Sequence, residues 1–139
     1  MQNTFKFQFP TDVETLGVVE KFIEDTQHLW NISEEAYGNI MVAVSEAINN
    51  AIFHGNKLDK SKHIYFEVSH KHNSLTFKIS DEGTGFNPDN LPDPTSPERI
   101  MEPGGRGIFL MKALADNVEF LENGKTVVLT FDLKKEVFS

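Results

Sequence analysis

Five segments of the sequence alternate apolar and polar residues, and this alternation constrains the fold more than any other feature. "TFKFQF" at 4–9 places a Phe at every second position, which is typical of a half-buried strand. "HIYFEVSHK" and "SLTFKIS" alternate likewise and are joined by only two residues. "NVEFLE" and "TVVLTFDL" flank Asn123-Gly124, which predicts a type I′ hairpin turn. Consecutive hairpins predict a mostly antiparallel sheet of five strands.

Three further segments have the periodicity of helices. The first is predicted from Asp12 to about Leu29, with Thr11 as its N-cap and Glu14 completing a capping box. The third is the short segment "IFLMKALAD".

The second helix is predicted to begin after the cap residue Ser33 and to stop at Gly55. Each of the three helices has a single apolar stripe, which predicts one helical layer covering one face of the sheet. The expected fold is therefore α+β, a two-layer sandwich, formed by a single domain over residues 1–139.

Composition narrows the classes of function. The 139 residues include no Cys, which excludes disulfides, thiolate nucleophiles and Cys-ligated zinc. A net charge of −8 repels phosphate backbones, so we expect no direct binding of nucleic acid. No leader pattern and no apolar run long enough for a membrane span is present, and we expect a cytoplasmic protein with no membrane contact.

The second helix carries polar residues that its stability does not require. Glu46, Asn50 and His54 recur every four residues along the edge of its apolar stripe. A solvated helix flank is the ordinary explanation for such a row. Asn is a poor helix former, however, and Glu before Asn makes no stabilising ion pair, so a role outside helix stability is indicated.

Two glycine-rich segments follow. In "DEGTGF" at 81–86, Asp81 ends a strand and offers a carboxylate acceptor, while Gly83 and Gly85 permit close backbone approach. Taken alone, this is an ordinary Asp/Gly turn, and it lacks the Gly-Lys-Ser/Thr of a P-loop. "GGRGIFLM" at 104–111 opens a helix whose free N–H groups favour an anion such as phosphate. Residues 81–107 also hold five of the six Pro, so we expect a long functional loop there.

In combination and in this order, "E-x-x-x-N-A-x-x-H-G" on a helix, "D-x-G-x-G-F" after a strand, and "G-x-G-I-F-L-M" opening a helix resemble the GHKL ATPase superfamily. The likeness spans nearly the whole chain and is strongest to the small bacterial anti-sigma-factor serine kinases. It implies the Bergerat-type ATP-binding fold, with ATP and Mg²⁺ as cofactors.

The resemblance also implies roles for single residues. Asn50 would coordinate Mg²⁺, and Glu46 would be the base that deprotonates the attacking hydroxyl. Asp81 would accept a hydrogen bond from the adenine amino group. Thr126 would support the adenine site, and residues 87–104 would form a lid.

The glycines would shape this site: Gly83 and Gly85 at the base, Gly105 and Gly107 at the phosphates. One departure concerns the γ-phosphate. Relatives often carry a basic residue just before the glycine pair, where this chain has Pro103; Arg106 or Arg99 could substitute as the catalytic cation.

The function implied by the resemblance is an anti-sigma factor and serine-protein kinase. It would sequester a sigma factor, phosphorylate an anti-anti-sigma protein of the STAS type, and possess the capacity to form a homodimer. An alternative is an ATP-binding regulatory switch that captures partners without phosphoryl transfer, which Pro103 favours and Glu46 opposes. A detached histidine-kinase catalytic domain is a third class, but no helix pair with an acceptor His is evident, and a gyrase-type ATPase would need a further domain.

Overall fold

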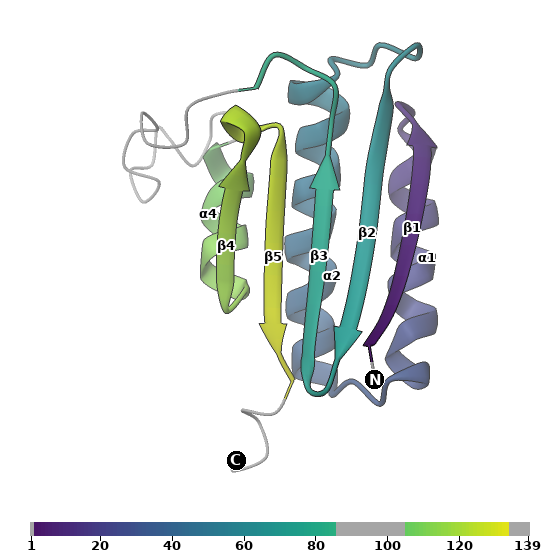
Figure 1. The fold of residues 1–139 in the computed structure, drawn as a ribbon, viewed down its shortest axis with the longest axis vertical. Helices are drawn as coiled ribbons and strands as arrows, with labels where there is room; N and C mark the ends of the chain where they lie inside the picture. Colours follow the sequence, from purple (N-terminus) through teal and green to yellow (C-terminus); the bar gives the residue numbers. More distant parts are fainter. Residues whose placement is uncertain (1, 86–104, 134–139) are drawn as a thin grey trace.

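Five strands form one sheet in the computed structural model, which describes residues 2–85 and 105–133 (Figure 1). The elements in chain order are β1 (Gln2–Pro10), α1 (Glu14–Leu29), α2 (Glu34–Asn49), the π-helical turn η1 (Asn50–Gly55), β2 (His63–Lys71), β3 (Ser74–Ser80), α4 (Gly105–Leu114), β4 (Asn117–Leu121), the 3₁₀ turn η3 (Glu122–Gly124) and β5 (Thr126–Asp132). The strand order is β1-β2-β3-β5-β4, and every neighbouring pair is antiparallel. The predicted α+β class and five-stranded antiparallel sheet are confirmed.

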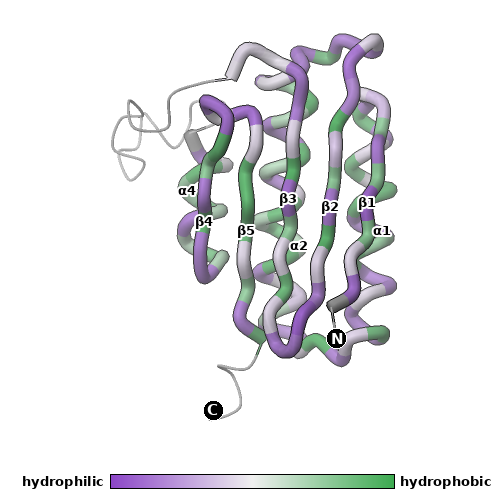
Figure 2. The backbone as a smooth tube through the Cα atoms, viewed as in Figure 1, coloured by the Kyte–Doolittle hydropathy of each residue, from purple (hydrophilic) through white to green (hydrophobic). Residues whose placement is uncertain are grey.

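Within the described residues, α1, α2 and α4 lie on the same face of the sheet, as Figure 1 shows. The tube coloured by hydropathy shows why, since apolar and polar residues alternate along the strands (Figure 2). Successive side chains of a strand point to opposite faces, so alternate residues of β2 and β3 meet the helices. Among the described residues no helix is long and apolar enough to cross a membrane.

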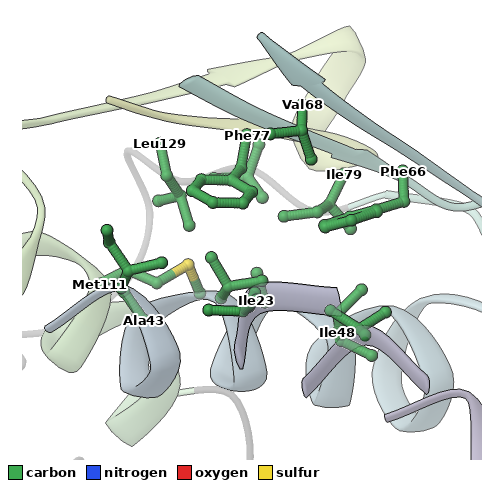
Figure 3. Close-up of a cluster of buried hydrophobic side chains, with 14 of the residues drawn as sticks. Ile23, Ala43, Ile48, Phe66, Val68, Phe77, Ile79, Met111 and Leu129 are labelled. Carbon is green, nitrogen blue, oxygen red and sulfur yellow. The ribbon is translucent and has the colours of Figure 1, made fainter. Parts of the chain in front are cut away.

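The core lies between the sheet and this helical layer (Figure 3). The sheet contributes Phe66, Val68, Phe77, Ile79 and Leu129, and the helices contribute Ile23, Ala43, Ile48 and Met111, all of them buried. Phe66 is central, because its ring lies 5.9 Å from the rings of Phe22 and Phe77, 6.0 Å from that of Phe7 and 6.3 Å from that of Phe9, measured between centroids. Burying one such side chain contributes about 1.5–3 kcal/mol of stability.

The second predicted helix is present, but its last turn is wider than predicted. The Ser33 hydroxyl caps α2 by accepting a hydrogen bond from the Ala36 N–H at 3.2 Å, as expected. After Asn49 the helix continues as η1, whose spacing is shown by the Asn56 N–H donating to the carbonyl of Ala51, five residues earlier. Gly55 ends the helix as predicted, but it does not have the left-handed conformation of a glycine C-cap.

The predicted capping box at the start of α1 is wrong. The helix begins at Glu14 with Val13 in the cap position, where no side chain caps it. The Thr11 hydroxyl is buried and donates to the Lys62 carbonyl at 2.7 Å. The Asp12 carboxylate accepts from the Glu14 N–H instead, at 2.9 Å. The Thr11 hydroxyl is itself buried, and a buried hydroxyl without a hydrogen bond is costly, so it bonds to the Lys62 carbonyl, which also accepts from the Thr11 N–H at 3.2 Å.

The predicted two-residue turn at Asn123-Gly124 is also wrong. Leu121 pairs with Thr126, so four residues connect β4 and β5. Glu122, Asn123 and Gly124 all have positive φ, at 52°, 59° and 85°. The wider connection carries the Lys125 carbonyl to the Asp81 N–H, which donates to it at 3.0 Å. The third predicted helix is present as α4, which starts at Gly105 rather than at Ile108.

Replacing Phe66 tests this account of the core. Phe66→Ala removes the ring at the centre of the aromatic cluster and should lower the free energy of unfolding by about 3–5 kcal/mol. The matched control is Phe53→Ala, because Phe53 is 43% exposed and should cost about 1 kcal/mol or less. Urea unfolding of both variants measures the difference, and equal losses would contradict the packing described.

Candidate functional site

The polar edge of α2 lies against the start of α4. Glu46 and Asn50 are half-buried and lie one helical turn apart. A Cβ added to Gly107 would lie 3.0 Å from Asn50 Nδ2 and 3.3 Å from Glu46 Oε2. The first turn of α4 therefore approaches both side chains so closely that a larger residue at 107 would crowd them.

Arg106 closes the same cluster. Its Nη2 lies 3.3 Å from Glu46 Oε1 and forms an ion pair with it. The Glu46 side chain is 15% exposed and the Arg106 side chain 63% exposed. An ion pair with one largely solvated partner is weak, so Arg106 is able to exchange Glu46 for another anion. His54, the third residue of the predicted row, is exposed on η1.

Asp81 follows β3 directly and is half-buried. Its Oδ1 accepts a hydrogen bond from the Gly83 N–H at 2.8 Å, and a carboxylate has further acceptor capacity on its second oxygen. Burial raises the pKa of this carboxyl above its ordinary value, while the Gly83 N–H and the charges of Lys125 and Lys62 oppose that rise. Asp81 is thus an acceptor held in a partly desolvated position.

Glycines allow the backbone to close around Asp81. A Cβ on Gly55 would collide with the Asp81 carboxylate, whose Oδ1 would lie 2.7 Å away, and a Cβ on Gly83 would collide with the Gly55 carbonyl oxygen. Gly85 has φ of 81°, and a Cβ there would collide with the Asn123 carbonyl oxygen. The end of η1, the segment after β3 and the β4–β5 connection therefore meet at this point.

Thr126 lies beside this cluster on β5. It is buried, and its Oγ1 lies 2.8 Å from the Ser80 hydroxyl and 3.4 Å from Glu122 Oε2. Ser80 pairs with Thr126 across β3 and β5 and immediately precedes Asp81. The sequence analysis missed Ser80, because its contact depends on the register of β3 against β5. It also missed the two lysines near Asp81, which immediately precede β2 and β5 and approach Asp81 only in the folded chain.

The structure thus forms two clusters along one helix. The first cluster contains Glu46, Asn50, Arg106 and Gly107, and the second contains Asp81, Gly83, Gly85 and Thr126. Gly105 opens α4 beside the first. Arg99, Pro103 and the predicted lid at 87–104 lie outside the described residues.

Alanine substitutions of glycine test the close approach at Asp81. Gly55→Ala places a methyl group on the Asp81 carboxylate and should lower the free energy of unfolding by about 1–3 kcal/mol. Gly38→Ala in α2 meets nothing within 4 Å and should raise it by about 0.5–1 kcal/mol, because Ala favours a helix. Urea unfolding compares the two variants, and stabilisation by Gly55→Ala would disprove the contact.

Comparisons with known proteins identify the family of this chain. The family described as the histidine kinase-like ATPase domain matches residues 9–131. A serine-protein kinase RsbW from Listeria innocua is 28% identical over 137 residues, covering 94% of this chain and 87% of the relative. An RsbW from Oceanobacillus iheyensis is 29% identical, covering 82% of this chain and 76% of the relative. An anti-sigma F factor from Clostridium perfringens is 28% identical, covering 86% of each chain.

A solved structure supports the same fold. The RsbU and RsbW domains of a Mycobacterium tuberculosis protein align with a TM-score of 0.64 at 14% identity, covering 94% of this chain and 32% of that longer one. The family match spans most of the chain, including both clusters. The chain therefore belongs to the histidine kinase-like ATPase family.

Proposed function

We propose that this chain binds Mg-ATP and acts as a serine-protein kinase and anti-sigma factor. It would sequester a sigma factor and phosphorylate an anti-anti-sigma protein of the STAS type. The observation that carries this proposal is the pair of clusters along α2 and η1. One offers the Asp81 carboxylate as an acceptor for the adenine base, and the other holds the Glu46 carboxylate beside the Asn50 amide. The names of its relatives, RsbW serine-protein kinase and anti-sigma F factor, support the choice of partners.

The length of the helix between the clusters suits a nucleoside triphosphate. Glu46 and Gly55 lie nine positions apart along α2 and η1, which corresponds to about 13 Å at the rise of an α-helix. Gly55 touches Asp81, so the two clusters are separated by a similar span. We assign the adenine to the Asp81 end, where this carboxylate accepts a hydrogen bond from the exocyclic amine while Thr126, Gly83 and Gly85 shape the pocket.

The phosphates belong at the other end. Gly105 and Gly107 let the first turn of α4 present its N–H groups to an anion. The amide oxygen of Asn50 fits Mg²⁺, which takes oxygen ligands and is commonly held by one or two protein groups together with substrate phosphates. When bound, this ion neutralises phosphate charge.

Glu46 then acts as the general base. Its carboxylate accepts the proton of the attacking serine hydroxyl, the serine oxygen bonds to the γ-phosphorus, and the bond from that phosphorus to the β,γ-bridging oxygen breaks to leave ADP. Arg106 exchanges Glu46 for the phosphoryl oxygens and stabilises their charge. The proposal includes a cytoplasmic location and homodimer formation.

The second candidate function is an ATP-dependent switch that captures partners without transfer. The ion pair between Arg106 and Glu46 supports it, because the carboxylate assigned as base is engaged by a guanidinium rather than left for a hydroxyl. Both functions need the adenine site, and only the kinase needs Glu46.

Asp81→Asn tests the adenine site. The amide keeps an acceptor for the Gly83 N–H but presents a donor to the adenine amine, so ATP affinity should fall by about 100-fold. Isothermal titration with Mg-ATP measures this. The matched control is Asp25→Asn, an exposed carboxylate of α1, which should leave ATP affinity unchanged. Unchanged ATP affinity in Asp81→Asn would show that the adenine site is not at Asp81.

The same variant should be more stable without nucleotide. Because burial raises the pKa of Asp81, the ionised carboxylate lowers the stability of the folded protein at neutral pH. As pH falls through the raised pKa and then the ordinary one, the folded protein takes up the proton first and this penalty disappears. Asp81→Asn should therefore have the higher Tm at pH 7, with the difference shrinking on acidification.

Glu46→Gln separates the kinase from the switch. ATP binding should persist, while phosphoserine formation should fall by about 10²–10⁴-fold because the base is lost. Immobilised protein with Mg-ATP is incubated with a lysate of the source organism, and mass spectrometry reads retained proteins and phosphoserine. Glu24→Gln, exposed on α1, is the control. Retained partners without phosphoserine in the unaltered protein would establish the switch instead.

A further inference from the structure

Three consecutive backbone N–H groups around Asp81 have fixed partners. The Asp81 N–H donates to the Lys125 carbonyl at 3.0 Å, and the Gly83 N–H donates to the Asp81 side chain. Between them the Glu82 N–H donates to Asn56 Oδ1 at 2.7 Å. Of these three acceptors, Asn56 Oδ1 is the one supplied by a side chain from outside the segment 81–83. The position of the Glu82 N–H therefore depends on which residue occupies position 56.

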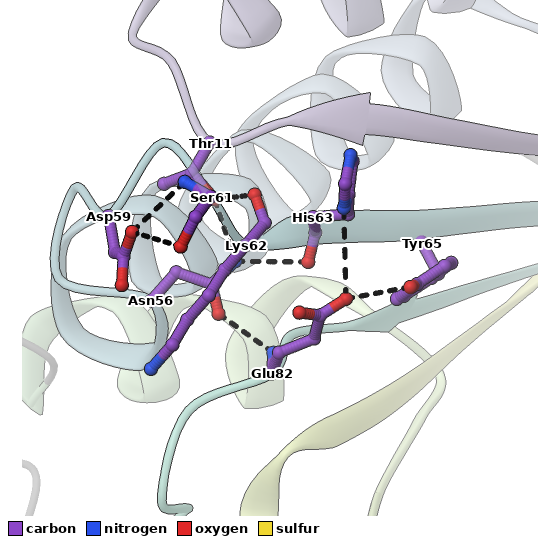
Figure 4. Close-up of polar contacts among 8 residues, drawn as sticks. All are labelled: Thr11, Asn56, Asp59, Ser61, Lys62, His63, Tyr65 and Glu82. Carbon is purple, nitrogen blue, oxygen red and sulfur yellow. Dashed lines mark hydrogen bonds and ion pairs between the residues drawn. The ribbon is translucent and has the colours of Figure 1, made fainter.

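Asn56 is itself held on all sides (Figure 4). It follows η1 directly and is 1% exposed. Its Nδ2 donates to Thr11 Oγ1 at 2.8 Å and to the His63 carbonyl at 3.0 Å. The carbonyl can only accept and the Glu82 N–H can only donate, so the orientation of the amide is fixed. The side chain joins the residue after β1, the start of β2, the end of the helix and the segment that carries Asp81.

A second contact holds the same segment from the sheet side. The Glu82 carboxylate accepts from the Tyr65 hydroxyl at 2.7 Å, and the His63 ring lies 3.9 Å from it (Figure 4). These partners are exposed and leave Glu82 freedom to move, whereas the Asn56 bond is partly buried. The bond to Asn56 is less exposed and is therefore the stronger restraint on the backbone beside Asp81.

We propose that Asn56 is a positioning residue for adenine recognition, because its side chain fixes the backbone from which Asp81 accepts the exocyclic amine. This inference rests on the proposed ATP site. Asn56 acts through Asp81 and its neighbour Glu82. Its loss should remove the preference for a 6-amino purine and leave recognition of the phosphates unaffected.

The test compares ATP with purine riboside triphosphate, which lacks the 6-amino group. Both are titrated with Mg²⁺ into the unaltered protein, Asn56→Ala, Asp81→Asn and the double variant. The unaltered protein should prefer ATP by about tenfold or more, the value of one hydrogen bond to a charged group. Asn56→Ala should lose most of that preference while affinity for the analogue stays within about twofold. The double variant should lose no more of the preference for ATP than Asp81→Asn alone, since both changes remove the same interaction with the 6-amino group.

Thr11→Val is the matched control. It removes a buried hydroxyl on the far side of Asn56 and lowers stability, but it leaves the bond between Asn56 and Glu82 in place. It should therefore retain the ATP preference. A folded Asn56→Ala that also retains the preference would overturn the proposal, and so would loss of the preference in Thr11→Val to the same degree.

Failure of the two proposals is distinguishable. If Asp81→Asn keeps both the affinity and the preference for ATP, the proposed adenine site itself is wrong. If Asp81→Asn loses them and Asn56→Ala does not, only the role of Asn56 is wrong. Should Asn56→Ala fail to fold, hydrogen exchange of the unaltered protein decides, because the Glu82 amide should be protected and free exchange would overturn the proposal.

Discussion

The close approach of two backbone segments, the end of η1 and the segment after β3, is the contact on which the rest of the site depends. Gly55 and Gly83 allow it, because a side chain on either would collide with the other segment or with Asp81. The contact fixes Asp81 relative to the helix that also carries Glu46 and Asn50. The π-helical spacing of η1 belongs to the same arrangement, since such turns recur at functional sites in helices.

Residues of the proposed site carry a cost in local stability. Asn49 and Asn50 occupy positions in a helix where Ala would be more favourable, and Asp81 retains a carboxylate where burial disfavours its charge. The large apolar core offsets such losses, with Phe66 and Phe77 at its centre. Because the protein tolerates these local penalties, its fold must draw its stability from the sheet–helix interface rather than from the site.

Much of the fold could be predicted from local sequence pattern, and the errors fall where distant residues decide. Alternation located the five strands, and the Ser33 cap was predictable because its partner lies three residues away. Thr11 was misassigned because its true acceptor, the Lys62 carbonyl, is 51 residues distant. In the sequence, Asn56 has no feature that distinguishes it from an ordinary loop residue. Its contacts with Thr11, His63 and Glu82 form only in the tertiary structure. The grouping of Glu46 with Asn50 followed from helical spacing, whereas their contact with Gly107 required the tertiary structure.

Because of the strand order, the site forms only when distant parts of the chain come together in the sheet. Ser80 and Thr126 are 46 residues apart in the chain but adjacent in the sheet, and α4 comes from the same later part of the chain as β5. Each cluster therefore combines residues from before and after the segment at 86–104. Neither part of the chain alone contains a complete cluster, so a nucleotide bound across both, as proposed, requires the completed sheet. Such a ligand would stabilise the whole domain by mass action, because it would bind the folded chain and not the unfolded one.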